Sequence, residues 1–225
     1  MKKYKILNLY ACLGGNRYKW DEVADNLEVT AVEFDPELAR MYQERFINDK
    51  VIVADAHQYL LEHYKEYDFI WSSPPCPSHS RARYWNSSNY ETTTKAIYPD
   101  MKLYQEILFL QHYFRTGKFV VENVIPFYEP LISSKKRGRH LYWTNFNLPT
   151  DLNDRRIQVG VCKNELKKLC EFHKIDILRY KGKQSLIKIA RNLVDYEAGK
   201  TILETAFGIQ TKQNFNQVSL FDELK

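Results

Sequence analysis

Residues Tyr67–Arg81 read YDFIWSSPPCPSHSR, a short apolar run that ends in two serines, two prolines and a cysteine. This pattern predicts a buried strand whose carboxyl end turns abruptly into a loop that carries Cys76. Each proline fixes its own φ and disfavours the helical region for the residue before it, so we expect a stiff backbone here. Ligands of open α/β sheets bind beyond the carboxyl ends of the strands. A free cysteine is often only a small buried hydrophobe, but this position favours a nucleophile.

Strands and helices are predicted to alternate before this stretch. We expect strands at Ile6–Ala11, Val29–Glu33, Val51–Asp55 and Phe69–Ser72, separated by helices at 16–27, Glu37–Phe46 and Ala56–Tyr64. Asp35-Pro36 supplies an N-cap followed by proline at the first helical position. Alternation at this spacing predicts an α/β fold with a doubly wound, mostly parallel sheet.

The second half of the chain is expected to continue this sheet and then to lose its regularity. After the cysteine we predict a polar loop at 78–94, a helix at Met101–Phe114, a strand at Phe119–Val121 that ends in Glu122-Asn123-Val124, a basic patch at Lys135–His140 and a strand at Leu141–Phe146. Residues 149–186 are rich in lysine and poorly periodic. Residues Ile187–Glu204 are expected to be helical with an interruption near Val194, and the chain from Gly208 onward looks like a tail.

Composition restricts the class of protein. A chain of 225 residues with 44% hydrophobic residues predicts one globular domain with at most a small additional lobe. No apolar run approaches the ~20 residues that span a bilayer, and the apolar part of the N-terminus is too short for a signal peptide. Four cysteines without the spacing of a disulfide framework favour a cytoplasmic protein. Cys162, Cys170 and His173 match no common zinc pattern, so we expect no metal. The net charge of +5 leans mildly toward a polyanionic partner.

Three successive strand ends carry residues suited to an adenosine-bearing cofactor. Gly14 and Gly15 follow the first strand, where the lack of a Cβ lets a ligand approach the backbone. Glu33 ends the second strand, where an acid can accept two ribose hydroxyls. Asp55 closes the third strand and could accept from an adenine amino group. A turn and two helix caps are the alternative interpretation. The full G-x-G-x-x-G pattern is absent, which disfavours nicotinamide and flavin.

The order of these motifs resembles that of the DNA cytosine-5 methyltransferases, in particular small bacterial or phage members. The resemblance runs from Ile6 to about Asn145, resumes at Arg191–Val194, and is most specific at Pro74-Pro75-Cys76 and Glu122-Asn123-Val124. It implies a Rossmann-like fold that binds S-adenosylmethionine, with a very small target-recognition region. The residues that it implies for cofactor binding are Tyr10, Gly14, Gly15, Glu33, Asp55, Pro74, Asn192 and Val194.

The resemblance also implies the catalytic roles, and these agree with what the reaction requires. Carbon 5 of cytosine is a poor nucleophile, so Cys76 would first add to carbon 6, from a positive setting that lowers its pKa. Glu122, buried with a raised pKa, would protonate or hydrogen-bond ring nitrogen 3, and Asn123 would hold the loop. Arg139, and secondarily Arg137, would bind the O2 atom of the base and the carboxylate of Glu122.

Double-stranded DNA is the expected partner, and the base must leave the duplex to reach this pocket. The predicted loop after the cysteine carries Ser80, Arg81, Arg83 and Trp85, which could bind phosphate and fill the gap left in the stack. A solvated, mobile surface segment is the alternative interpretation of this loop. An RNA (tRNA) cytosine-5 methyltransferase and a catalytically silent DNA-binding module remain alternatives for the whole chain. Whether a restriction enzyme accompanies the protein is not encoded in this sequence.

The sequence departs from the family pattern at several positions. Pro77 stands where the family usually has glutamine, Lys135 replaces the glutamine before the arginine pair, and Ala11 and Leu13 thin the glycine motif. Arg155-Arg156 is a rival placement for the arginine motif. Only about fifty residues separate that motif from Asn192. We therefore expect a catalytic domain at 1–146 and 187–207, a reduced target-recognition or connecting region at 147–186 and a flexible tail at 208–225.

The tail contains Gln217-Val218-Ser219-Leu220-Phe221, which resembles the short peptide with which bacterial replication and repair proteins dock on the sliding clamp. Leu220 and Phe221 would fill an apolar pocket, and Gln217 would anchor the peptide by hydrogen bonds. Packing of this peptide back onto the domain is the alternative, and five-residue patterns often match by chance. We expect a monomer.

Overall fold

The computed structural model describes residues 3–88, 94–155, 157 and 164–209. Its strands are β1 (Tyr4–Leu9), β2 (Leu27–Glu33), β3 (Lys50–Val53), β4 (Phe69–Ser72), β5 (Lys118–Val124), β6 (Lys135–Arg137) and β7 (His140–Thr144). Its helices are η1 (Asn16–Glu22), α1 (Pro36–Arg45), α2 (Ala56–His63), η2 (Tyr64–Glu66), α3 (Arg81–Ser88), α4 (Lys102–Tyr113), α5 (Glu165–His173), α6 (Leu186–Arg191) and α7 (Tyr196–Phe207).

The strands form one seven-stranded sheet in the order β3-β2-β1-β4-β5-β7-β6. Strands β1 to β5 run parallel to one another, whereas β7 is antiparallel to both β5 and β6. The predicted doubly wound, mostly parallel sheet is therefore confirmed. The strand order reverses between β1 and β4, which places the carboxyl ends of both strands at the switch point where such sheets bind ligands.

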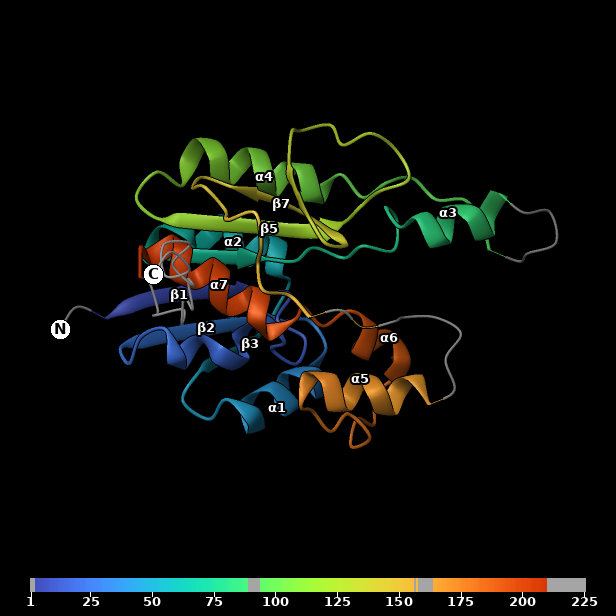
Figure 1. Ribbon diagram of the computed structural model, residues 1–225, viewed down its shortest axis with the longest axis horizontal. Coiled ribbons are helices and arrows are strands. Elements are labelled where there is room, and N and C mark those ends of the chain that lie inside the picture. The colour runs from blue at the N-terminus through green and yellow to red at the C-terminus, as the bar shows by residue number, and fades with distance from the viewer. Residues whose placement is uncertain (1–2, 89–93, 156, 158–163, 210–225) are drawn as a thin grey trace, which may run out of the picture.

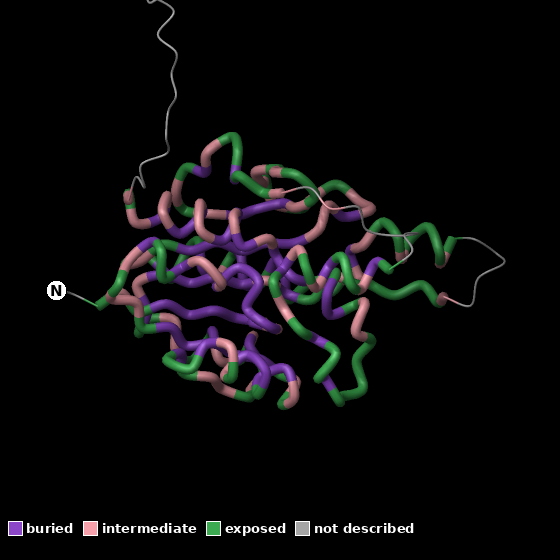
Figure 2. The backbone as a smooth tube through the Cα atoms, turned by 60° about the horizontal axis from the view of Figure 1, so that its bottom comes forward, coloured by how far each residue is buried: buried purple, intermediate pink, exposed green. Residues whose placement is uncertain are grey.

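Helices cover both faces of the sheet because its central strands are apolar on both sides (Figure 1). On one face α2 and α4 pack against alternate residues of the strands, such as Leu7, Ile70 and Val121. On the other face η1 and α7 pack against Ile6, Phe69 and their neighbours. A third cluster joins α1 to the small helical lobe of α5 and α6. The buried residues therefore concentrate along the strands, as Figure 2 shows.

Asp35 and Asp55 start the helices that follow β2 and β3. The Asp35 carboxylate accepts hydrogen bonds from the backbone N–H groups of Glu37 and Leu38, and Pro36 occupies the first turn. The Asp55 carboxylate accepts from the N–H groups of His57 and Gln58. Both N-caps fix the direction in which the chain leaves the sheet edge.

Three predicted segments differ from the structure. The polar loop predicted at 78–94 contains helix α3, which projects beyond the sheet (Figure 1) and is held by the Tyr84 ring stacked on Phe127 with centroids 4.6 Å apart. The basic patch contains strand β6, which pairs with β7 across a turn at Gly138, where φ is +53°. The poorly periodic region contains α5, whose Leu169 is buried in the third cluster. Tertiary contacts formed these elements against weak local signals.

Smaller differences concern the ends of the predicted elements. The helix expected at 16–27 is a 3-10 helix that ends at Glu22 and is kinked at Lys19. The interruption predicted near Val194 is confirmed, because α6 ends at Arg191 and α7 begins at Tyr196. The clamp-like peptide with Gln217, Leu220 and Phe221 lies outside the described residues. Among the described helices, none combines the length and the apolar character that crossing a bilayer requires.

Candidate active site

Cys76 lies on a loop that the neighbouring strand holds in place. Its backbone carbonyl accepts hydrogen bonds from the N–H groups of His79 (3.0 Å) and Ser80 (3.1 Å), which closes a tight turn directly after the thiol. The buried Asn123 side chain, at the carboxyl end of β5, donates from Nδ2 to the carbonyl of Pro74 at 2.9 Å. The predicted holding contact of Asn123 is present, and it attaches the loop with Cys76 to the strand with Glu122.

The electrostatic setting of Cys76 is the reverse of the predicted one. Burial, and secondarily the negative charge of Glu122, raise the pKa of the Cys76 thiol to about 11. The positive setting expected to lower this pKa is not formed among the described residues, because the charge that acts on the thiol is the carboxylate of Glu122. At neutral pH the thiol is therefore almost entirely protonated.

This pKa predicts how Cys76 reacts with an alkylating reagent. Iodoacetamide attacks only through the thiolate, so the rate of Cys76 alkylation is expected to rise about tenfold per pH unit from 7 to 10 and to level off near 11. Peptide mass spectrometry after timed quenching measures this rate, and Cys76→Ser identifies the modified peptide. A midpoint below pH 8 would contradict the raised pKa.

Glu122 is a buried carboxylate at the carboxyl end of β5, with 6% of its surface exposed. Its position in the ladder places it opposite Tyr142 of β7, and His140 lies opposite Val124. The His140 Nε2 atom lies 3.4 Å from the Glu122 Oε1 atom. His140, which the sequence interpretation did not single out, thus lies beside the carboxylate of Glu122. The alternation of side chains along β7 puts it on the same sheet face as Glu122.

The two arginines of the predicted motif have separate positions. Arg137 donates from Nε to the carbonyl of Pro149 (2.6 Å) and from Nη1 to that of Lys136 (2.8 Å), so it fastens the β6–β7 hairpin to the following segment. The structure does not bring Arg137 to Glu122. Arg139 is exposed and lines a large cavity, and the ion partner recorded for Glu122 in the described part of the chain is His140 instead.

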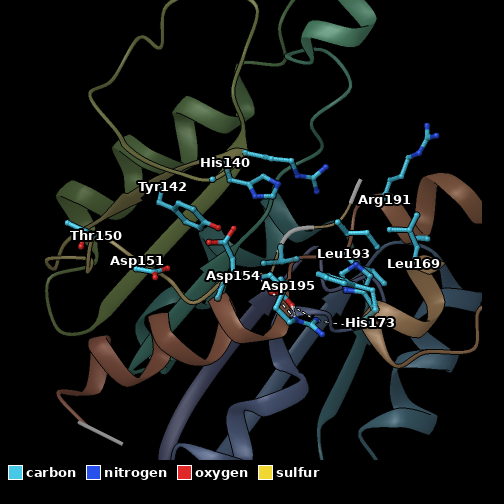
Figure 3. A pocket seen from close by; sticks show the side chains of 18 residues that line it. His140, Tyr142, Thr150, Asp151, Asp154, Leu169, His173, Arg191, Leu193 and Asp195 are labelled. Atoms are coloured by element: carbon cyan, nitrogen blue, oxygen red, sulfur yellow. Dashed lines mark hydrogen bonds and ion pairs between the residues drawn. The ribbon is translucent and has the colours of Figure 1, made fainter. Parts of the chain in front are cut away.

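That cavity has a volume of about 940 Å³ and lies between the sheet edge and the small helical lobe. In Figure 3, His140 and Tyr142 lie on one side of it, and Leu169, His173 and Leu193 lie on the other. Its polar lining mixes positive and negative side chains. The cavity is therefore an open cleft beside the hairpin that carries Arg139, large enough for a nucleotide-sized group.

The rival arginine motif serves the fold of the helical lobe. Arg155 forms an ion pair with Asp195, donates to the Tyr196 hydroxyl at 2.7 Å and packs its guanidinium over the Phe172 ring at 4.0 Å from the centroid. These contacts connect the segment after β7 to the start of α7. Arg156 lies outside the described residues.

The carboxylate of Glu33 lies at the end of β2 and accepts hydrogen bonds from the backbone N–H groups of Cys12, Phe34 and Asp35. Its Oε2 accepts from Cys12 N–H at 2.8 Å, and its Oε1 accepts from Asp35 N–H at 2.9 Å. Burial raises the pKa of this carboxyl. A carboxylate has about four acceptor positions, so it can accept a further bond beside these three. Next to it, Phe34 exposes 75% of its surface, and the sequence interpretation did not single out this ring, although its place directly after Glu33 was a usable signal.

The other residues predicted at the cofactor end have protein partners in this structure. A Cβ at Gly14 would lie 2.4 Å from a Phe46 ring atom, and a Cβ at Gly15 would lie 2.5 Å from the carbonyl oxygen of Val194. The glycines thus permit close packing of the turn after β1. Val194 is buried beside them, whereas Asn192 is exposed at the end of α6.

Asp55 keeps part of its carboxylate accessible. Its Oδ1 caps α2, and its Oδ2 lies 3.7 Å from Lys102 Nζ. The capping bonds and Lys102 lower the pKa of this carboxyl against the opposing effect of burial, which is the largest single influence. Asp55 is thus charged at neutral pH and has a free side toward solvent.

The segment after Cys76 uses two of its predicted DNA-binding residues to hold itself in place. Arg81 Nε donates to the Pro126 carbonyl at 3.0 Å, and Arg83 Nη2 donates to the Lys95 carbonyl at 3.0 Å. Ser80 forms an isolated β-bridge with Pro126. Trp85 is 65% exposed on the projecting helix α3. Arg81 and Trp85 are exposed, whereas Ser80 and Arg83 are half-buried.

Known proteins resemble this chain in sequence and in fold. A sequence model of a family described as "C-5 cytosine-specific DNA methylase" matches residues 4–138, more than half of the chain. A search of curated proteins found no match. Similar solved structures include a mutant of Spodoptera frugiperda DNMT2 at 23% identity, covering 54% of this chain and 36% of that one, with a TM-score of 0.40.

Two further solved structures are similar at lower identity. A putative DNA modification methyltransferase of an Escherichia coli prophage is 15% identical, with 56% of this chain and 34% of that one covered and a TM-score of 0.37. A SAM-dependent methyltransferase of Agrobacterium tumefaciens is 17% identical, with 59% and 41% covered and a TM-score of 0.37. The chain matches well under half of the length of each of these three structures.

Proposed function

The chain belongs to the C-5 cytosine-specific DNA methylase family, and on that premise we propose that it methylates carbon 5 of cytosine in DNA through a covalent adduct with Cys76. The family uses S-adenosylmethionine as its methyl donor. The observation that carries the proposal is the junction of two strand ends, where Asn123 ties the Cys76 loop to β5 and the buried Glu122 is close enough to raise the pKa of the thiol.

The residues at the ends of β2 and β3 fit this cofactor. The Glu33 carboxylate, oriented by backbone N–H groups at the end of β2, suits the hydroxyls of a ribose as an acceptor. The exposed ring of Phe34 offers a face for a purine, and the accessible carboxylate of Asp55 offers an acceptor for its amino group. When bound, S-adenosylmethionine supplies the methyl group as an electrophilic carbon on a sulfonium sulfur.

In the proposed reaction the Cys76 thiol loses a proton and the Glu122 carboxylate gains one. The carboxylate charge is one of the causes of the raised thiol pKa. Loss of the thiol proton and protonation of Glu122 therefore favour each other, since a neutral Glu122 no longer opposes the thiolate. Protonated Glu122 can then donate to ring nitrogen 3 while the sulfur of Cys76 bonds to carbon 6. The electron pair of the carbon 5–carbon 6 double bond shifts to carbon 5, which takes up the methyl group.

Release reverses the addition. A water molecule takes the proton of carbon 5, the bond from carbon 6 to sulfur breaks, and Cys76 leaves with its electron pair as the double bond forms again. Ring nitrogen 3 returns its proton to Glu122 and from there to Cys76, which restores the starting protonation. His140, 3.4 Å from Glu122, can stabilise the carboxylate form between turnovers. Arg139 on the adjacent turn carries a fixed positive charge that suits the O2 atom of the base.

Helix α3 supports a nucleic-acid partner. It projects from the body of the protein directly after the Cys76 loop (Figure 1) and carries the exposed Trp85. Tyr98, on the segment that returns from it, is 95% exposed. Exposed aromatic side chains next to a base pocket can stack on bases or fill the space that a flipped base leaves.

The test is transfer of labelled methyl from S-adenosylmethionine to duplex DNA, with tRNA as a parallel acceptor. We expect label on cytosine in DNA, mapped to its target sequence by bisulfite sequencing. Transfer to tRNA alone would contradict the proposed substrate and favour the RNA branch of the reaction. Binding of the cofactor product without transfer to either acceptor would favour a DNA-binding module without activity. Clamp docking through the C-terminal peptide and the domain limits at 146, 187 and 208 stay predictions from the sequence.

A further inference from the structure

Glu106 of α4 is a buried carboxylate outside the site described so far, with 1% of its surface exposed. It receives three side-chain hydrogen bonds: from the Tyr10 hydroxyl (2.5 Å), from the Ser72 hydroxyl (2.6 Å) and from His57 Nδ1 (2.9 Å). A buried carboxylate without partners would be strongly unfavourable. With three donors on two oxygens it becomes a rigid junction between elements that are distant in the sequence.

The three donors come from the three segments that form the proposed cofactor end. Tyr10, with φ at +56°, begins the turn between β1 and the glycines. His57 lies two residues after Asp55, in the first turn of α2. Ser72 ends β4, two residues before Pro74 and four before Cys76. One side chain therefore connects the turn after β1, the turn after β3 and the strand that leads to the nucleophile.

We propose that Glu106 is a positioning residue for the cofactor, which fixes the turn after β1 and the start of α2 relative to the strand that carries Cys76. The inference rests on the proposed function, specifically on the binding of S-adenosylmethionine at these strand ends. Glu106 need not touch the cofactor, because it acts through Tyr10, His57 and Ser72. The hydrogen bond to Glu106 is the main cause that raises the pKa of His57, so the buried carboxylate favours the protonated form of this imidazole.

These hydrogen bonds join residues that are far apart in the sequence, so they fix the positions of separate segments relative to one another. Tyr10 and Glu106 are 96 residues apart, and Ser72 and Glu106 are 34 residues apart. Strand pairing already aligns β1 with β4, but the pairing stops at Leu9 and Ser72. Beyond that point a bond from the Ala11 N–H to the Val32 carbonyl (3.1 Å) holds the turn after β1 to β2, and the Glu106 junction joins this turn to β4 and to α2.

The test measures the affinity of the full-length protein for S-adenosylhomocysteine by isothermal titration calorimetry. Tyr10→Phe removes one hydroxyl, and Glu106→Gln keeps the shape but turns one oxygen into a donor that faces other donors. We expect each variant to weaken binding by about 5- to 20-fold. Because both changes act on one junction, the fold-loss of affinity in the double variant is expected to be much smaller than the product of the fold-losses in the two single variants.

Tyr67→Phe is the matched control. Tyr67 is a buried tyrosine whose hydroxyl is hydrogen-bonded to the Tyr59 hydroxyl at 3.1 Å and to the Thr30 side chain, but it precedes β4 at the opposite edge of the sheet. We expect a comparable fall in thermal stability and less than about a twofold change in affinity. The contrast separates positioning of the cofactor from general stability.

Several results would overturn the inference. These are unchanged affinity in folded Tyr10→Phe, equal losses in Tyr10→Phe and Tyr67→Phe, or additive losses in the double variant. If Glu106→Gln does not fold, Tyr10→Phe and Ser72→Ala compared with Tyr67→Phe decide the matter. A wild-type protein that does not bind S-adenosylhomocysteine would also overturn it. A wild-type protein that binds this ligand but does not methylate DNA would contradict only the proposed substrate.

Discussion

Replacing Cys76 with serine is expected to reduce methyl transfer to cytosine by about 10⁴-fold or more while the affinity for S-adenosylhomocysteine stays within about twofold. A serine hydroxyl is a far weaker nucleophile at neutral pH than a thiol. The burial and the Glu122 charge that raise the pKa of Cys76 would oppose an alkoxide even more strongly. Steady-state transfer of labelled methyl to duplex DNA measures the loss.

The covalent step has its own readout in a matched pair of variants. A duplex with 5-fluorocytosine at the target cannot lose a proton from carbon 5, so wild-type protein should remain bonded to it on a denaturing gel, and Cys76→Ser should not. Cys170→Ser is the control, since Cys170 is also a free, half-buried cysteine but lies on α5 in the helical lobe. It is expected to keep full adduct formation. Residual activity above about one tenth in Cys76→Ser would contradict the assignment of the nucleophile.

Glu122→Gln is expected to move two properties of the protein in opposite directions. Methyl transfer should fall by about 10²- to 10³-fold, because the amide cannot pass a proton to ring nitrogen 3. Alkylation of Cys76 by iodoacetamide at pH 7.5 should become faster, because removal of the carboxylate charge lowers the raised thiol pKa from about 11. Parallel transfer assays and timed mass spectrometry measure the two effects on one preparation.

The faster alkylation of Cys76 in Glu122→Gln distinguishes the loss of the Glu122 charge from a general disturbance of the fold. Glu165→Gln is a suitable control for the alkylation assay, since Glu165 is also a buried carboxylate, paired with Arg191 at 2.7 Å, and is not among the causes of the Cys76 pKa shift. It is expected to leave alkylation of Cys76 unchanged within about twofold. Slower or unchanged alkylation in Glu122→Gln would contradict the coupling between the two groups.

Most of the sheet was predictable because its information is local. The apolar run Phe69–Trp71 predicts a strand that is buried on both faces of the sheet. The prolines that follow end this strand whatever its neighbours are. The Asp35 and Asp55 caps likewise act within three residues of their own positions. Helix α3 and strand β6 were not predictable in this way, because the Tyr84–Phe127 stack and the pairing with β7 supply what their sequences lack.

The residues of the candidate site could also be predicted from the sequence, but the contacts that each of them makes could not. Cys76 follows β4, and Glu122 and Asn123 lie at the carboxyl end of β5, so their place at one edge of the sheet follows from parallel pairing. The separation of Arg137 from Arg139 depends on the turn at Gly138, which directs Arg137 to the carbonyls of the next segment and leaves Arg139 at the cavity. No local sequence pattern specifies that this turn sends Arg137 and Arg139 in different directions.

The sequence by itself thus determined the fold class, the strand that carries the nucleophile and the residue types at the edge of the sheet. Only the tertiary structure decided that His140 is the partner of Glu122, that Glu106 joins three strand ends and that Cys76 is held protonated. The physical reason is that secondary structure follows from patterns a few residues long, whereas pKa values and hydrogen-bond partners depend on burial and on charges brought together from distant parts of the chain.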